Sequence, residues 1–158
     1  MEEQRTWEVR RKDRQSSEQE ARELLSSGEY GVLSTVGPDG EPYGVPLSYV
    51  FRDGDICFHS APEGRKLQNL TPNARASFCV VGATEVLPAQ FSTRYQSVIA
   101  SGEVRELEGE EKTQALGWLV EKYSPEFLQQ GREYIASSQH KTRVFALRVR
   151  HLSGKRRI

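Results

Sequence analysis

Two adjacent cations, Arg65 and Lys66, stand where a hydrophobic run gives way to a Leu-x-x-Leu pattern. A helix that begins near Gly64 would direct its free backbone N–H groups and the positive end of its dipole toward both side chains. Because Arg offers a bidentate fork and Lys a mobile point charge, the stretch predicts a phosphate site. A solvated surface pair beside Glu63 accounts for the same residues equally well.

His59 and Ser60 end the strand pattern just before this loop, where side chains can point over a ligand. Ser60 supplies a hydroxyl group, and His59 supplies a donor that titrates near neutral pH. A lone histidine at a strand end is more often structural than functional. The role of His59 therefore stays open on this pattern alone.

Other chemistry finds little support in the residue pattern. The motifs GxxxxGK[ST], GxGxxG and GxSxG are absent, which disfavours nucleotide hydrolysis and Ser-His-Asp catalysis. His140 and His151 do not stand at metal-ligand spacing, so no metal site is predicted. Cys57 and Cys79 are predicted to be buried free thiols. An anion site without an obvious nucleophile or base points to a bound phosphorylated cofactor that carries the reactivity.

The composition suits one globular domain, or one protomer that completes its core by dimerising. The chain has 158 residues, of which 36% are hydrophobic and 28% are charged. Lys plus Arg and Asp plus Glu both total 22, so no overall charge draws the chain to nucleic acid or to a membrane surface. No apolar stretch approaches the roughly 20 residues that span a bilayer, and the first residues lack the core of a signal peptide, so we expect a cytoplasmic protein.

Hydrophobic periodicity predicts about six strands, joined mostly by hairpins, with helices inserted late. A capping box at Ser17 to Glu20 begins a short helix that Gly28 ends. The predicted strands cover 31–36, 42–51, 55–60, 75–82, 95–107 with a bend at Gly102, and 142–152. Further helices are predicted after Gly64, before Ser124 and over 125–136. This order favours an antiparallel sheet closed into a small barrel. We expect an N-terminal extension over 1–15, the barrel domain over 16–152, and a frayed basic tail over 153–158.

Four segments, in this order and spacing, resemble the pyridoxamine phosphate oxidase-like, flavin-binding split-barrel superfamily. They are GVPLSYVF, ICFHSAPEGRKLQNLTPNARASFCV, YQSVIASGEVREL and LSGKRR. The likeness runs from about Glu8 to Arg157 and is greatest to the nitroimidazole-resistance group. It implies a mainly β fold, a six-stranded antiparallel split β-barrel with an N-terminal helix and inserted helices. It also implies a homodimer with two composite FMN sites at its interface.

The resemblance further implies which residues line the flavin. The Arg-Lys pair that grips the flavin phosphate in relatives is matched by Arg65 and Lys66, and a polar residue early in the fifth strand is matched by Ser97. The whole implied cofactor-binding set is Val45, Pro46, Leu47, Ser48, Tyr49, His59, Ser60, Ala61, Arg65, Lys66 and Ser97. Position alone makes His59 and Tyr95 the candidates for contact with a substrate.

The departures from the family pattern narrow the expected reaction. Pyridoxamine phosphate oxidases carry an Arg and a Lys where this chain has Gly44 and Tyr49, and a Gln where it has Ser97. Oxidation of pyridoxamine phosphate is therefore not expected. The nitroimidazole-resistance relatives imply reduction of a nitro group or of another small electron-poor molecule, with electrons from a nicotinamide cofactor.

Two alternatives keep the barrel and change its use. In the first, deazaflavin or haem replaces FMN, and a haem would take its axial ligand from His59, His140 or His151. In the second, the chain is a ligand-binding module without catalysis, and the old flavin site holds another anion.

Overall fold

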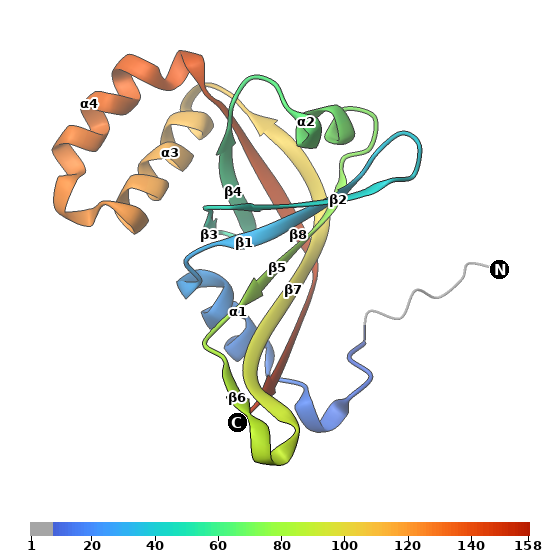
Figure 1. Cartoon of the computed structure of the whole chain (residues 1–158). Coiled ribbons are helices and arrows are strands. Elements are labelled where there is room, and N and C mark those ends of the chain that lie inside the picture. The colour runs from blue at the N-terminus through green and yellow to red at the C-terminus, as the bar shows by residue number, and fades with distance from the viewer. Residues whose placement is uncertain (1–7) are drawn as a thin grey trace.

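The structure, a computed structural model, describes residues 8–158. One antiparallel sheet curls into a split barrel, with a short helix below it and a helical hairpin beside it (Figure 1). The strands are β1 (Gly31–Val36), β2 (Pro42–Leu47), β3 (Val50–Arg52), β4 (Asp55–Ser60), β5 (Arg75–Val81), β6 (Glu85–Leu87), β7 (Ser92–Leu107) and β8 (Arg143–Arg157). The helices are α1 (Glu18–Ser27), α2 (Arg65–Leu70), α3 (Gly109–Tyr123) and α4 (Leu128–Ser138). The strand order is β2-β1-β5-β7-β8-β4-β3, and β6 pairs with β7.

The split-barrel fold is confirmed, but the sheet has eight strands, not six. The predicted strand over 42–51 is divided at Ser48 and Tyr49, where the chain leaves β1 and joins β4. The division arises because the backbone N–H and C=O of Tyr49 bond to Tyr123 and Lys122 on α3. The additional strand β6 forms a short hairpin with the start of β7.

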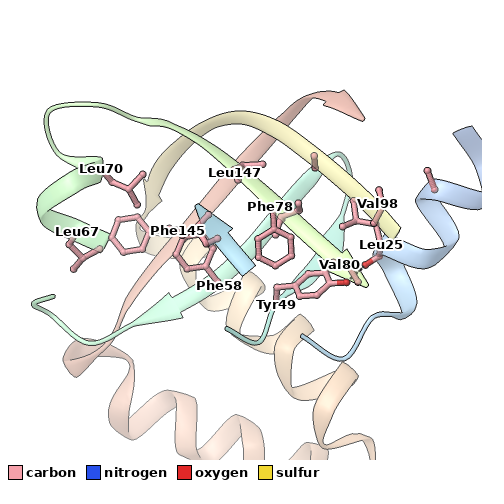
Figure 2. Packing of buried hydrophobic residues seen from close by; sticks show 14 residues of the cluster. Leu25, Tyr49, Phe58, Leu67, Leu70, Phe78, Val80, Val98, Phe145 and Leu147 are labelled. Carbon is pink, nitrogen blue, oxygen red and sulfur yellow. Dashed lines mark hydrogen bonds between the residues drawn. The ribbon is translucent and has the colours of Figure 1, made fainter. Parts of the chain in front are cut away.

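Aromatic side chains fill the barrel interior (Figure 2). The rings of Tyr49 and Phe78 meet edge to face at 4.7 Å, and those of Phe58 and Phe145 stack at 5.7 Å. Leu25 of α1 is fully buried and closes one end of this core. Gly28 ends α1 as predicted, and it also leaves room for a neighbour, because a Cβ there would lie 2.5 Å from the Tyr49 hydroxyl oxygen.

A second apolar layer lies between α3 and the outer face of β4 and β8. Cys57, Val144 and Ala146 pack there against Ala115 and Leu119 of α3. In the sequence, Phe145, Leu147 and Val149 alternate with Ala146, Arg148 and Arg150, a pattern that favours one apolar and one cationic face. Both faces are apolar at the start of β8, because α3 covers the outer one.

The expectation of a frayed tail over 153–158 is wrong. β8 continues to Arg157, which pairs with Tyr95, and Gln15 forms an isolated bridge with Lys155. The bend expected at Gly102 is confirmed as a register shift between β7 and β8. Residues 1–7 of the predicted N-terminal extension lie outside the described part of the chain. No helix within residues 8–158 is long and apolar enough to cross a membrane.

Candidate functional site

The cation pair stands on a firmly seated helix. Leu67 and Leu70 of α2 are buried in the barrel core, and the Asn69 side-chain amide donates to the Thr35 hydroxyl at 3.0 Å. These contacts leave Arg65 exposed and Lys66 half-buried at the start of the helix. Within residues 8–158, no carboxylate forms an ion pair with either cation. Both charges are therefore available to an anion.

Tyr43 of β2 holds the guanidinium of Arg65. The guanidinium carbon lies 4.6 Å from the centre of the Tyr43 ring, within the range of a cation–π interaction. This contact leaves the N–H groups at the rim of the guanidinium able to meet an anion, and it links α2 to the strand that carries Val45 and Leu47. Sequence reasoning missed Tyr43, because its only signal is its place two residues before the implied ring segment.

The loop before α2 contains one conformation that favours glycine and is held by one long-range contact. Gly64 has a φ of 153°, a conformation that favours glycine, and nothing lies within 4 Å of the position that a Cβ would take. The guanidinium of Arg143 donates to the Pro62 carbonyl at 3.3 Å and is itself held by the Glu106 carboxylate at 2.7 and 2.9 Å. Arg143 is a second residue that sequence reasoning missed, since this partner lies 81 residues away.

His59 and Ser60 face different spaces. The Ser60 side chain is buried on the core side of β4, and its hydroxyl donates to the Ala61 carbonyl at 2.8 Å. His59 points to the side of α3, as Cys57 does two residues earlier. Burial, and then the charge of Lys66, lower the pKa of the His59 imidazole below its ordinary value. His59 is therefore mostly neutral at pH 7.

The implied ring segment is divided between the surface and the core. Val45 and Leu47 pack against the barrel core, while Pro46 and Ser48 are exposed. Tyr49 is fully buried, and its hydroxyl donates to the Leu25 carbonyl oxygen. The side chain of Tyr49 thus belongs to the core and not to an open surface.

Ser97 and Tyr95 lie far from the cation pair within one chain. Ser60 pairs with Arg143 at the start of β8, whereas Ser97 pairs with Lys155 near its other end. Tyr95 pairs with Arg157, one step beyond Ser97 on the same face of β7. A single protomer therefore brings Arg65, Lys66 and His59 together, but not Ser97 or Tyr95.

The family model described as pyridoxamine 5'-phosphate oxidase matches residues 17–156, which is most of the chain. The chain belongs to the pyridoxamine 5'-phosphate oxidase family. The match includes the strand end at His59, the cation pair and the whole of β7. No curated protein matches the chain.

Solved structures of low sequence identity share this family fold. A candidate 5-nitroimidazole antibiotic resistance protein from Bacteroides thetaiotaomicron has a TM-score of 0.71 at 21% identity, with 89% of this chain and 84% of that chain covered. A conserved hypothetical protein from Mycobacterium tuberculosis has a TM-score of 0.78 at 22% identity, covering 94% and 90%. The FAD and haem binding protein of Mycobacterium smegmatis has a TM-score of 0.79 at 21% identity, covering 90% and 73%.

A phosphate-bearing cofactor of this family fits the residues at the start of α2. Arg65 and Lys66 have no carboxylate partner in the described chain, and the open side of Gly64 permits close approach of a ligand to the backbone. Among residues 8–158, no group of three His, Cys, Asp or Glu side chains could hold a metal ion. Cys57 is buried and its thiol pKa is raised by burial to about 12, so it is a poor nucleophile.

Proposed function

We propose that this family member is a homodimeric, FMN-dependent oxidoreductase that reduces a small electron-poor molecule with electrons from a nicotinamide cofactor. The observation that carries the proposal is the uncompensated pair Arg65 and Lys66, placed beside β2 by the contact with Tyr43. Membership of the pyridoxamine 5'-phosphate oxidase family supports it. Nitroaromatic compounds are the substrate class favoured by the fold shared with the candidate 5-nitroimidazole resistance protein.

The protein's own part in this reaction is binding and orientation. Arg65 would bind two phosphate oxygens through its fork, while Lys66 would add a point charge. Tyr43 restricts the guanidinium to one plane, which lowers the entropy lost when the anion binds. Val45 and Leu47 are fixed by the core and would keep the neighbouring backbone in place against a ring. A flavin, when bound, supplies hydride and single-electron transfer.

The outer face of the sheet suits a second copy of the chain. The strand register aligns Val32 of β1, Cys79 of β5 and Ile99 of β7 in one row across this face. Ile99 is 48% exposed, and Val81, one row away, is 58% exposed. Apolar side chains gathered on one sheet face are typical of an interface. In the proposed homodimer, the composite site would combine the cation pair of one chain with Ser97 of the partner subunit.

The proposal is tested by the absorbance spectrum and by FMN titration. The purified protein should be yellow, or should quench the fluorescence of added FMN with 1:1 stoichiometry per chain. Replacing Arg65 and Lys66 together by Ala should weaken FMN binding at least tenfold. The matched control replaces Arg132 and Lys141, two exposed cations on and after α4, and should leave FMN affinity unchanged. A colourless protein that takes up no FMN would refute the proposal.

Haem binding is a second candidate, favoured by one observation on this chain. No hydrogen bond joins the His59 imidazole to another described residue, and the side chain lines a pocket. The FAD and haem binding protein of Mycobacterium smegmatis shares the fold. A Soret band after haem addition that is lost in His59→Ala, but kept in His140→Ala, would support this candidate.

A ligand-binding module without catalysis would instead be protected from thermal unfolding by FMN while showing no turnover with NADH or NADPH.

A further inference from the structure

A pocket of about 270 Å³ lies between β4 and the hairpin formed by α3 and α4. Its walls are apolar where α3 and α4 face each other, with Leu119, Val120 and Ile135 among the lining residues. Polar groups also line it, among them His59, Ser138 and Gln139. Figure 1 shows the hairpin standing beside the barrel at this place.

The position of His59 follows from the alternation of β4. Ile56, Phe58 and Ser60 point toward the barrel core, so Cys57 and His59 point toward the helices. α3 packs over Cys57, whereas His59, two residues further along β4, lines the pocket. A neutral imidazole offers one N–H donor and one acceptor, and neither is used by another described residue.

Contacts near both ends of the hairpin keep the pocket from collapsing. Near the turn, Gly131 lets α4 approach α3 closely, because a Cβ there would lie 2.4 Å from a Val120 methyl group. At the other end, the Thr113 hydroxyl donates to the Gln139 side-chain oxygen at 2.8 Å. The helices are thus joined on both sides of the hollow. A preformed pocket of this kind costs little to order when a ligand enters.

The helix α4 is poorly covered by its own chain. Ile135 is its one buried residue in the described structure, while Tyr134 is 71% exposed at the rim of the pocket. An amphipathic helix normally buries a continuous stripe. A bound molecule that contacts Ile135 would also cover part of the exposed Tyr134 ring.

The lining decides the chemistry of that molecule. None of its side chains carries a formal charge at pH 7 when His59 is neutral, so an ion would lose its hydration without gaining a partner. Hydroxyl, amide and imidazole donors are present beside the apolar walls. The volume of about 270 Å³ is slightly below the range of about 300–1,000 Å³ that is usual for ligand pockets, so it suits a small molecule. We propose that this pocket binds a neutral, single-ring aromatic molecule bearing one hydrogen-bond acceptor, which His59 recognises. The proposal does not depend on flavin binding.

The test uses 4-fluoroacetophenone, a neutral ring with one carbonyl acceptor, followed by fluorine NMR on the full chain. We expect saturable binding with a Kd of about 1 mM or tighter, as ligand-efficiency limits allow for so small a molecule. Ser138→Phe fills the pocket and should abolish binding. Ser137→Phe, on the exposed neighbour that does not line the pocket, is the matched control and should leave binding unchanged. His59→Leu keeps the volume and removes the donor, and should weaken binding about fivefold.

Several outcomes would overturn the inference. One is the absence of saturable binding, and another is equal loss in the two serine variants. The third combines two results: the parent chain does not bind the probe, and Ser138→Phe changes the oligomeric mass. That combination would show that a second copy of the chain occupies the pocket. Should Ser138→Phe fail to fold, the probe affinities of His59→Leu and His140→Leu are compared instead. Equal affinities in these two variants would overturn the inference. The double variant Arg65→Ala, Lys66→Ala should still bind the probe, which separates this site from the proposed FMN site.

Discussion

The ammonium of Lys122 lies 3.8 Å from the centre of the Tyr49 ring and donates a 2.8 Å hydrogen bond to the carbonyl oxygen of the same residue. Next to it on α3, the Tyr123 hydroxyl accepts from the Tyr49 N–H at 3.0 Å and bonds to the Glu29 carbonyl at 2.6 Å. These contacts fix the chain where β2 passes into β3. The helical hairpin therefore fixes the chain directly after β2, the strand that contains Val45 and Leu47 of the candidate site.

Lys122→Met should destabilise the protein by about 1–3 kcal/mol, because the variant removes the shorter of two hydrogen bonds to the Tyr49 carbonyl and a half-buried cation–π contact. The other hydrogen bond, from the Tyr123 hydroxyl at 3.0 Å, remains. Urea unfolding followed by circular dichroism measures the change. Lys141→Met, on an exposed lysine, should change the free energy of unfolding by less than about 0.5 kcal/mol. Equal effects of the two substitutions would contradict the structural role of Lys122.

The stability difference between the parent chain and Lys122→Met should depend on pH. Burial lowers the pKa of Lys122 to about 8, from an ordinary value of 10.5. Between these values the unfolded chain binds more protons at this lysine than the folded chain, so its contribution to the free energy of unfolding rises with pH. Urea unfolding of both proteins from pH 7 to 10.5 tests the sign. The comparison cancels the opposite effect of Cys57, whose raised thiol pKa is common to both. A difference that shrinks as pH rises would refute the assignment.

Two glycines in helical surroundings should respond in opposite directions to alanine. Gly28→Ala should destabilise the chain by about 1–3 kcal/mol, because the new methyl group would lie 2.5 Å from both the Tyr49 hydroxyl and Val80. Gly117→Ala, inside α3 with nothing within 4 Å of its Cβ position, should stabilise it by roughly 0.5–1 kcal/mol. Thermal unfolding of both variants provides the measurement, and a tolerated Gly28→Ala would mean that the close approach is not rigid.

The pKa of His59 should report the charge near α2. Lys66→Gln should raise it, because Lys66 is one of the two causes that hold it below the ordinary value. Inorganic phosphate should also raise it in the parent chain, but not in Lys66→Gln, if the anion binds at the cation pair. Proton NMR titration of the imidazole signals measures both effects, with His140 as the internal control. Unchanged His59 titration in the variant would exclude this electrostatic link.

Ile99→Asp should dissociate the proposed homodimer, since it places a charge at the most exposed member of the row formed by Val32, Cys79 and Ile99. Sedimentation equilibrium would then give the mass of one chain, and FMN affinity should fall with it. Phe127→Asp, on an exposed aromatic at the turn of the helical hairpin, is the control and should retain the mass of the parent. If the parent chain is already monomeric, the proposal of a composite site between two chains is refuted.

Features with a local cause could be predicted from the sequence. The Ser17 hydroxyl accepts from the Glu20 N–H at 3.1 Å, as the capping box requires. In the sequence, Leu116 and Leu119 stand at i and i+3, which indicates one apolar helix face, and α3 presents both toward the barrel. The break at Tyr49 could not, because its causes, Lys122 and Tyr123, lie more than 70 residues away. The extension of β8 to Arg157 could not be predicted for the same reason, since Arg157 pairs with Tyr95, which is distant in sequence.

For the candidate site, the sequence predicted the cation pair but not its surroundings. Arg65 and Lys66 lie together at the start of α2, yet the ring of Tyr43 and the anchoring by Arg143 come from strands distant in sequence. Strand alternation places the side chains of His59 and Ser60 on opposite faces of β4, which the loop sequence after them did not indicate. The cofactor roles of these residues and of Ser97 stay predictions.

Ser97 and Ser60, the strand end that precedes the cation pair, lie beside opposite ends of β8, and this separation has a genetic consequence. If each site takes its cations from one chain and its Ser97 from another, a chain altered at 65–66 and a chain altered at 97 are each defective alone. A heterodimer of the two would contain one doubly altered site and one intact site. Such chains would complement each other when expressed together, restoring up to half of the sites.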